Sequence, residues 1–192
     1  IKHARGVGVW GENKVEEKSV VMARARREEA ASGQKYHFAR IFDICVEKGS
    51  ELEKGDKNRK YKGRAVFQGN RVNDQNWEAA IFQDLGSSPA AVEASRAADA
   101  FGMLPGNCVR VADAEQAYTQ SYLDSSVKTF VELPRERWLD HWSHMKAPVC
   151  PLVLSLYGHP DSGGYWEQHC DRILRENGWT QIGDWRSCYW HA

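Results

Sequence analysis

Alternating apolar and polar residues mark two β-strands in the first half of the chain. Residues 37–46 alternate and are rich in Phe and Ile, and residues 61–68 alternate again after a polar, glycine-containing connection. Two strands joined in this way are expected to pair antiparallel. Because side chains two residues apart share one face of a strand, Lys62 and Arg64 are predicted to project together into a common cleft.

Further periodic segments flank this predicted hairpin. Residues 12–31 carry spaced apolar residues among charges and are followed by Ser32-Gly33, which predicts an amphipathic helix closed by a glycine. Ser88 and Pro89 form a good helix start, with the serine as the cap of an alanine-rich helix that Gly102 stops. The other expected elements are a short strand leading into Asp113, a strand at 128–133, a helical segment at 135–146 with Trp138 and Trp142 in the core, an apolar stretch at 149–156, and a helix at 165–177. The pattern indicates an α+β fold.

Composition is typical of a folded domain. The 192 residues are 42% hydrophobic and 27% charged, with 26 basic and 26 acidic side chains, so no net charge attracts nucleic acid. No apolar run approaches the length of a membrane span, the N-terminus does not resemble a signal peptide, and no membrane partner is expected. The five cysteines are scattered and form no CxxC pair, which argues against a zinc ribbon and favours a reduced intracellular compartment. The chain begins with Ile1, not Met, which suggests a piece of something longer.

Positive charge is concentrated just before and at the start of the second strand of the predicted hairpin. Lys57, Arg59, Lys60, Lys62 and Arg64 fall within eight residues. Such a cluster forms either a solvated face or a phosphate-binding surface, and charge alone leaves both open.

An acidic residue stands at the end of another short alternating run. Val109 and Val111 lead to Asp113, and Ala117 and Tyr118 follow. A carboxylate at a strand end is a suitable ligand for Mg²⁺ near a phosphate, although the same residue type is common in turns and caps.

A glycine-containing turn precedes the helix predicted at 165–177. It includes Tyr157 and Gly158, with Gly163 and Gly164 shortly afterwards. A turn of this kind is either an ordinary loop or a place where the backbone closely approaches a planar or phosphorylated ligand.

In this order, the segments resemble the reverse transcriptase domain of copia-type retrotransposon polyproteins. Residues 60–66, KYKGRAV, resemble the fingers motif YKARLV of that family. Residues 111–118, VADAEQAY, resemble its first catalytic motif, an acidic residue followed by VKTAF. Residues 155–166 resemble SLYGLKQSPRQW, and Cys188-Tyr189 stands where the family often has a cysteine followed by an aromatic residue.

The resemblance implies a role for each matching residue. Asp113 would be catalytic as a ligand of magnesium, and Tyr118 would be a steric gate that rejects a ribose 2′-hydroxyl. Lys62 and Arg64 would contact the triphosphate of the incoming nucleotide. Tyr157 and Gly158 would flank the nascent base pair and the template. The main-chain amides near the phosphates would be those of Ala114, Glu115, Gln116 and Ala117.

The resemblance also implies an architecture, partners and a location. Residues 1–36 would be a helical lead-in, and residues 37–192 would be the fingers and part of the palm of a truncated polymerase. The complete enzyme would use two Mg²⁺ ions, or Mn²⁺ in their place. Its partners would be deoxynucleoside triphosphates, a primed RNA or DNA template, and the integrase and ribonuclease H parts of the polyprotein, in a cytoplasmic particle or the nucleus.

Departures from the family pattern limit the expected activity. Pro160-Asp161 and Gly163-Gly164 replace the usual Lys-Gln and Pro-Arg pairs, and the family's YVDD motif does not occur in the 192 residues. Because two-metal transfer needs carboxylates from both motifs, this piece is expected to bind nucleotide or nucleic acid weakly and to synthesise no DNA.

Three alternatives remain open at this point. The chain could be a non-catalytic nucleic-acid-binding or structural remnant that uses the same basic strand. It could be a thiol hydrolase that uses Cys170 with His169 or His159, although His169 and Cys170 would point about 100° apart on a helix. His141 and His144 could meet on a metal, but no third ligand is evident.

Overall fold

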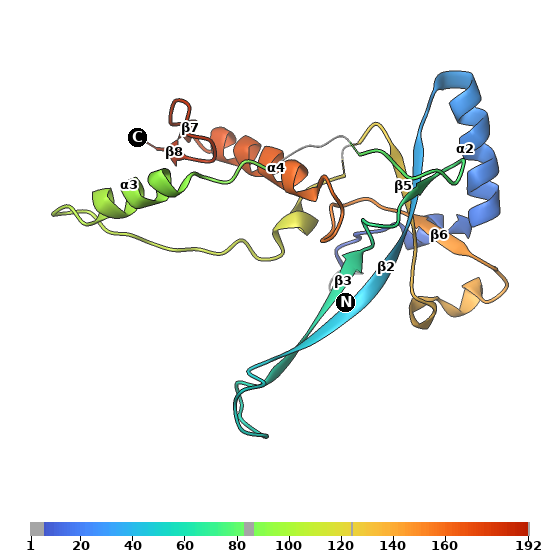
Figure 1. Cartoon of the computed structure of the whole chain (residues 1–192), viewed down its shortest axis with the longest axis horizontal. Helices are drawn as coiled ribbons and strands as arrows, with labels where there is room; N and C mark the ends of the chain where they lie inside the picture. The colour runs from blue at the N-terminus through green and yellow to red at the C-terminus, as the bar shows by residue number, and fades with distance from the viewer. Residues whose placement is uncertain (1–5, 83–86, 124, 192) are drawn as a thin grey trace.

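The computed structural model describes residues 6–82, 87–123 and 125–191 (Figure 1). They form an α+β fold around a mostly antiparallel sheet in which the strands run in the order β1-β6-β5-β2-β3, with β4 attached to β2. The strands of this sheet are β1 (Glu16–Glu17), β2 (Tyr36–Lys48), β3 (Lys60–Phe67), β4 (Asn73–Asp74), β5 (Lys128–Glu132) and β6 (Pro148–Pro151). The helices are α2 (Lys18–Ser32), α3 (Val92–Gly102) and α4 (Ser162–Glu176), and β7 (Thr180–Gln181) pairs with β8 (Tyr189–Trp190).

The predicted hairpin is confirmed. β2 and β3 pair antiparallel from Ile41 opposite Phe67 to Lys48 opposite Lys60. The root of the hairpin is buried, since Ile41 and Phe67 are 4% and 1% exposed, whereas the outer half projects away from the sheet as a two-stranded ribbon (Figure 1). The ribbon therefore presents its basic strand to solvent.

Hydrophobic residues fill both sides of the sheet. On one side α2 packs against β2, β5 and β6 through Val21, Met22, Ala25, Tyr36, Phe38, Phe130 and Val149. The other core includes Trp10, Ile41, Phe67, Val131, Leu133, Trp142, Leu152, Leu154 and Leu156. Full burial of one such aliphatic side chain contributes about 1.5–3 kcal/mol, so these two clusters hold the sheet together.

The strand predicted at 128–133 is present, but it pairs in a direction that the pattern did not indicate. β5 runs parallel to β2, with His37 opposite Thr129 and Arg40 opposite Glu132. β6 then pairs antiparallel to β5. Because it pairs with β2 along one edge and with β6 along the other, β5 lies in the centre of the sheet, where Val131 is fully buried.

The first helix begins later than the predicted residue 12. A 3-10 turn η1 (Glu12–Lys14) and β1 come first, and α2 ends at Gly33 in the left-handed conformation, as expected. The Glu17 carboxylate accepts hydrogen bonds from the main-chain N–H groups of Lys146 and Ala147 at 2.9 and 3.0 Å. These contacts and the pairing of β1 with β6 hold residues 16 and 17 extended, against their helical pattern. β1 and α2 share a sheet and a core with the later strands, and the division at residue 36 stays a prediction.

The helix predicted over 135–146 is wrong. Two 3-10 turns occupy this range, η3 (Arg135–Arg137) and η4 (Asp140–Trp142). Trp142 is nevertheless in the core, as expected, and is fully buried. The Trp138 indole N–H donates to the Leu133 carbonyl at 3.1 Å, and this contact ties the segment back to the end of β5.

The capping role predicted for Ser88 is also wrong. α3 begins at Val92 with Ala91 as its cap, and it includes Gly102. The Ser88 N–H instead donates to the Glu167 carboxylate at 2.7 Å, so long-range pairing to α4 overrides the local start signal. α4 itself begins three residues before the predicted start at 165, and Gly178 follows it with φ +83°. Within the described residues, no helix has the length and apolar character needed to cross a membrane.

Candidate functional site

A hollow of about 640 Å³ lies where three distant segments of the chain meet. β3 contributes Lys62, Gly63, Arg64 and Ala65, the segment before α4 contributes Leu156 and Tyr157, and the middle of the chain contributes Asp113, Ala114, Glu115, Gln116 and Thr119. The residues singled out on the basic strand, at the acidic residue and in the glycine turn are thus brought together. The hollow is also lined by Gly63, Ala65, Thr119 and Leu156, which carry no chemical signal by which the sequence could single them out.

The basic wall of the hollow comes from β3. Lys62 lies opposite Val46 and Arg64 opposite Ile44, two positions apart on the strand, and both side chains are exposed. Across the described residues, neither cation forms an ion pair with a carboxylate. Two unpaired cations on one wall make the hollow suited to an anion.

Tyr157 connects the basic wall to the middle segment. The Arg64 guanidinium lies 5.9 Å from the centre of the Tyr157 ring, within the range of a cation–π contact. The Tyr118 ring packs against the same tyrosine with a centroid distance of 4.7 Å. Tyr118, Ala117 and Gly158 adjoin the hollow without lining it.

The strand predicted before Asp113 is not formed. Residues 107–114 are irregular and exposed, and Val111 is 94% exposed. No strand among the described residues lies beside this segment to pair with its backbone, and an alternating pattern alone does not make a strand. Asp113 therefore lines the hollow from an irregular segment, not from the end of a strand.

The backbone after Asp113 offers hydrogen-bond donors to the hollow. Gln116 has φ +55°, and the chain then turns into the 3-10 helix η2 (Ala117–Gln120). Within the described part of the chain, the N–H groups of Ala114, Glu115 and Gln116 donate to no other protein group. Such a run of unpaired N–H groups is suited to bind phosphate oxygens.

In the part of the chain that the structure describes, the carboxylates that line the hollow are those of Asp113 and Glu115. Their hard oxygens match the ligand preference of Mg²⁺. Among the residues that the structure describes, no group of three or more His, Cys, Asp or Glu side chains is arranged to hold a metal. The donor set thus fits one partly solvated ion better than a closed protein site.

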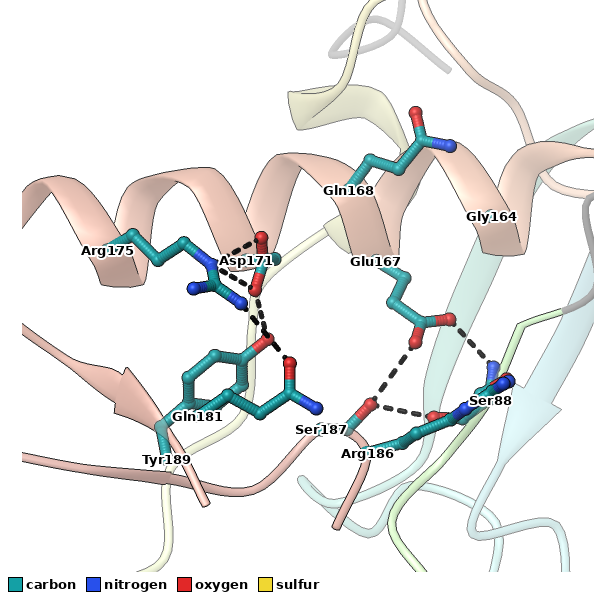
Figure 2. Close-up of a pocket in the computed structure, with 10 residues that line it drawn as sticks. All are labelled: Ser88, Gly164, Glu167, Gln168, Asp171, Arg175, Gln181, Arg186, Ser187 and Tyr189. Atoms are coloured by element: carbon teal, nitrogen blue, oxygen red, sulfur yellow. Dashed lines mark hydrogen bonds and ion pairs between the residues drawn. The ribbon is translucent and has the colours of Figure 1, made fainter. Parts of the chain in front are cut away.

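A second hollow, of about 510 Å³, lies between α4 and the β7–β8 hairpin (Figure 2). Its charged side chains form hydrogen bonds with other groups of the protein. Asp171 accepts from Arg175 at 2.8 Å and from the Tyr189 hydroxyl at 2.8 Å, and Arg186 donates to the Ser88 hydroxyl at 2.7 Å. Burial and the hydrogen bond to Asp171 raise the pKa of Tyr189 to about 12. This network fastens the hairpin and the Ser88 segment to α4, which gives the polar groups of this hollow a structural role.

Two buried histidines lie behind the Tyr157–Gly158 turn. His37 and His159 are each 6% exposed, and the Phe82 ring contacts both, at 4.8 and 5.3 Å between centroids. Burial, and to a lesser extent positive charge on His37, lower the pKa of His159 to about 4. Burial also lowers the pKa of His37, against the opposing effect of Asp74. Both side chains are therefore neutral at pH 7.

Stability is expected to fall on acidification because of His159. The His159 side chain is protonated below about pH 6.5 in the unfolded chain but only below about pH 4 in the folded chain. The free energy of unfolding therefore falls between these two pH values, by up to about 3 kcal/mol. Urea unfolding at pH 7.5, 6 and 4.5 measures the slope. His159→Phe should flatten it, whereas His144→Gln, at an exposed position, should not. Equal slopes for the His159→Phe and parent chains would contradict the assignment.

The alternative sites receive no support from their surroundings. Burial raises the pKa of the Cys170 thiol, which disfavours the thiolate that a hydrolase would need. The neighbouring His169 contacts Arg172 at 3.3 Å and the Trp166 ring. His141 packs edge-on against Trp142, and over the described ranges neither His141 nor His144 belongs to a metal-binding group.

Comparisons of the chain with protein-family models, with curated proteins and with solved structures found no match. A function for this chain therefore has to be argued from the hollow itself.

Proposed function

We propose that the chain is the fingers and front palm of a copia-type reverse transcriptase, an RNA-directed DNA polymerase. The observation that carries the proposal is the convergence of three segments on one hollow: the basic strand, the Asp113 segment and the Tyr157 turn. These are the segments that resemble the family's motifs, and they are far apart in the sequence. The parent protein would act on primed template with deoxynucleoside triphosphates, beside integrase and ribonuclease H, in a cytoplasmic particle or the nucleus.

Each wall of the hollow has a role in this proposal. Lys62 and Arg64 bind the triphosphate and offset the charge that develops as it is transferred. The N–H groups at 114–116 donate to phosphate oxygens, and Tyr118 lies under the incoming sugar. Tyr157 packs beside the nascent base pair, and Asp113 holds Mg²⁺. Mg²⁺ held there would supply positive charge that offsets the charge of the phosphates.

A second candidate function is binding of nucleic acid without chemistry. Asp113 lies on an exposed, irregular segment, and the hollow has one other carboxylate, Glu115. Two exposed cations on a projecting ribbon bind a phosphate backbone without any metal. Dependence on Mg²⁺ separates the two functions.

Mg²⁺ is expected to tighten binding of a deoxynucleoside triphosphate by about tenfold, because Asp113 would hold an ion whose charge offsets that of the phosphates. Titration of a fluorescent deoxynucleoside triphosphate with and without Mg²⁺ measures this effect. Asp113→Asn should remove the Mg²⁺ effect, because the amide is a poor ligand of the same size. Asp99→Asn, an exposed change on α3 away from the hollow, should retain it.

Two results would go against the polymerase proposal. One is an undiminished Mg²⁺ effect in Asp113→Asn. The other is binding of single-stranded nucleic acid with no metal-dependent nucleotide binding, which would favour the second candidate.

A further inference from the structure

The main chains of Gly69 and Gly158 approach each other closely beside the hollow. A Cβ atom placed on Gly69 would lie 2.2 Å from the carbonyl oxygen of Gly158, and one placed on Gly158 would lie 2.2 Å from that of Phe67. Real Cβ atoms essentially never come within 3.0 Å of such a neighbour. Gly158 also has φ +89°, whereas Gly69 lies outside the left-handed region, so its requirement is purely spatial.

This contact holds the Tyr157 turn against the end of β3. The Phe67 N–H donates to the Tyr157 carbonyl at 2.7 Å. On the other side of the turn, the buried Ser162 hydroxyl donates to the Leu156 carbonyl at 2.8 Å and accepts from the Leu156 N–H at 3.1 Å. The main chain of Tyr157 is thus held between β3 and the first turn of α4.

The contact between Gly69 and Gly158 also determines the position of the Tyr157 ring relative to the basic wall. Arg64 is on the same strand as Phe67, three residues earlier, so any shift of the turn along β3 changes the 5.9 Å separation of the Arg64 guanidinium and the Tyr157 ring. We propose that Gly69 is a positioning residue: its missing side chain lets Tyr157 and Arg64 face one nucleotide together. The inference rests on the proposed nucleotide site.

Gly69→Ala is expected to move the turn without adding backbone strain. The Gly158 oxygen would have to retreat from 2.2 Å to at least 3.0 Å from the new Cβ, a shift of about 0.8 Å. A misplacement of this size at a binding site is enough to lose about tenfold in nucleotide affinity. Gly6→Ala is the matched control, because Gly6 has no positive φ and no neighbour within 4 Å of a built Cβ.

The test compares nucleotide binding in a double-mutant cycle. Arg64→Ala, Tyr157→Ala and the double variant are made in the parent and in the Gly69→Ala chain, and affinity for a fluorescent deoxynucleoside triphosphate with Mg²⁺ is measured. The two residues should be coupled in the parent and in the Gly6→Ala control, and their effects should become additive with Gly69→Ala. Unchanged coupling in Gly69→Ala would overturn the inference.

Amide hydrogen exchange supplies a readout that needs no ligand. Exchange of the Phe67 N–H should accelerate about tenfold or more in Gly69→Ala and stay unchanged in Gly6→Ala. If the parent bound no nucleotide, the proposed function would fail, and the exchange rate would still decide whether Gly69 holds the turn. If Gly69→Ala did not fold, the parent chain would supply the test. Saturating nucleotide should slow exchange of the Phe67 N–H in the parent, and an exchange rate that nucleotide leaves unchanged would overturn the inference.

Discussion

DNA synthesis is expected to fall about 1000-fold or more when Asp113 is replaced by Asn in a longer chain that carries the paired aspartates of the proposed polymerase. The substitution keeps the volume and polarity of the side chain but removes a charged metal ligand, and loss of several kcal/mol of charge stabilisation corresponds to about this factor. A primer-extension assay with deoxynucleotides measures the loss. The isolated 192-residue chain, with Asp113 and Glu115 as the carboxylates of the hollow, should give no extension.

Tyr118→Ala provides the contrast within the same assay. It should retain part of the DNA synthesis and admit ribonucleotides more readily, because it removes the bulk that lies under the sugar while leaving the metal ligand in place. Robust extension by the isolated chain, or by the longer Asp113→Asn protein, would mean that the metal site has been misassigned.

Replacement of both Lys62 and Arg64 by alanine is expected to weaken binding of a deoxynucleoside triphosphate by about 100-fold. Each cation makes a charge-assisted contact worth about 1.5–3 kcal/mol, and the lower value applies here because both side chains are exposed. Titration of a fluorescent deoxynucleoside triphosphate at several salt concentrations measures the loss. The affinity of the double variant should depend less on salt than that of the parent.

The matched control removes the same charge elsewhere on the ribbon. Lys54 and Lys57 are both exposed in the connection between β2 and β3, and neither lines the hollow. Their double replacement should reduce affinity only slightly. An equal loss of nucleotide affinity in the two double variants would show that affinity depends on the net charge of the ribbon and not on the two cations that line the hollow.

The elements that could be predicted from the sequence are those that a local pattern determines. Alternation identified β2 and β3 because one face of the hairpin root is buried, and Ile41 and Phe67 are the residues that bury it. The helix α4 followed from its own periodicity and from Gly178. Lys62 and Arg64 share a wall of the hollow because the two-residue repeat of a strand requires them to lie on one face.

The elements that could not be predicted depend on partners far away in the chain. Val109 and Val111 alternate as strand residues do, but the described chain supplies no strand to pair with them, and the segment stays irregular. Glu17 belongs to a helical pattern but is held extended by main-chain N–H groups near residue 147. Nothing in the sequence shows that Gly69 and Gly158 touch, because a glycine records only that a side chain is absent.

A small tilt at the root of the projecting β2–β3 ribbon would displace its tip by a larger distance. From Phe42 to Lys48 the ribbon extends about 20 Å beyond its buried root, at about 3.4 Å per residue. A tilt of about 5° at the root, where Ile41 pairs with Phe67, would carry the tip through about 2 Å and Arg64, opposite Ile44, through about 1 Å. The same tilt would carry Lys62, opposite Val46, nearly as far as the tip, so a partner that moved the tip would also move the basic wall relative to Tyr157.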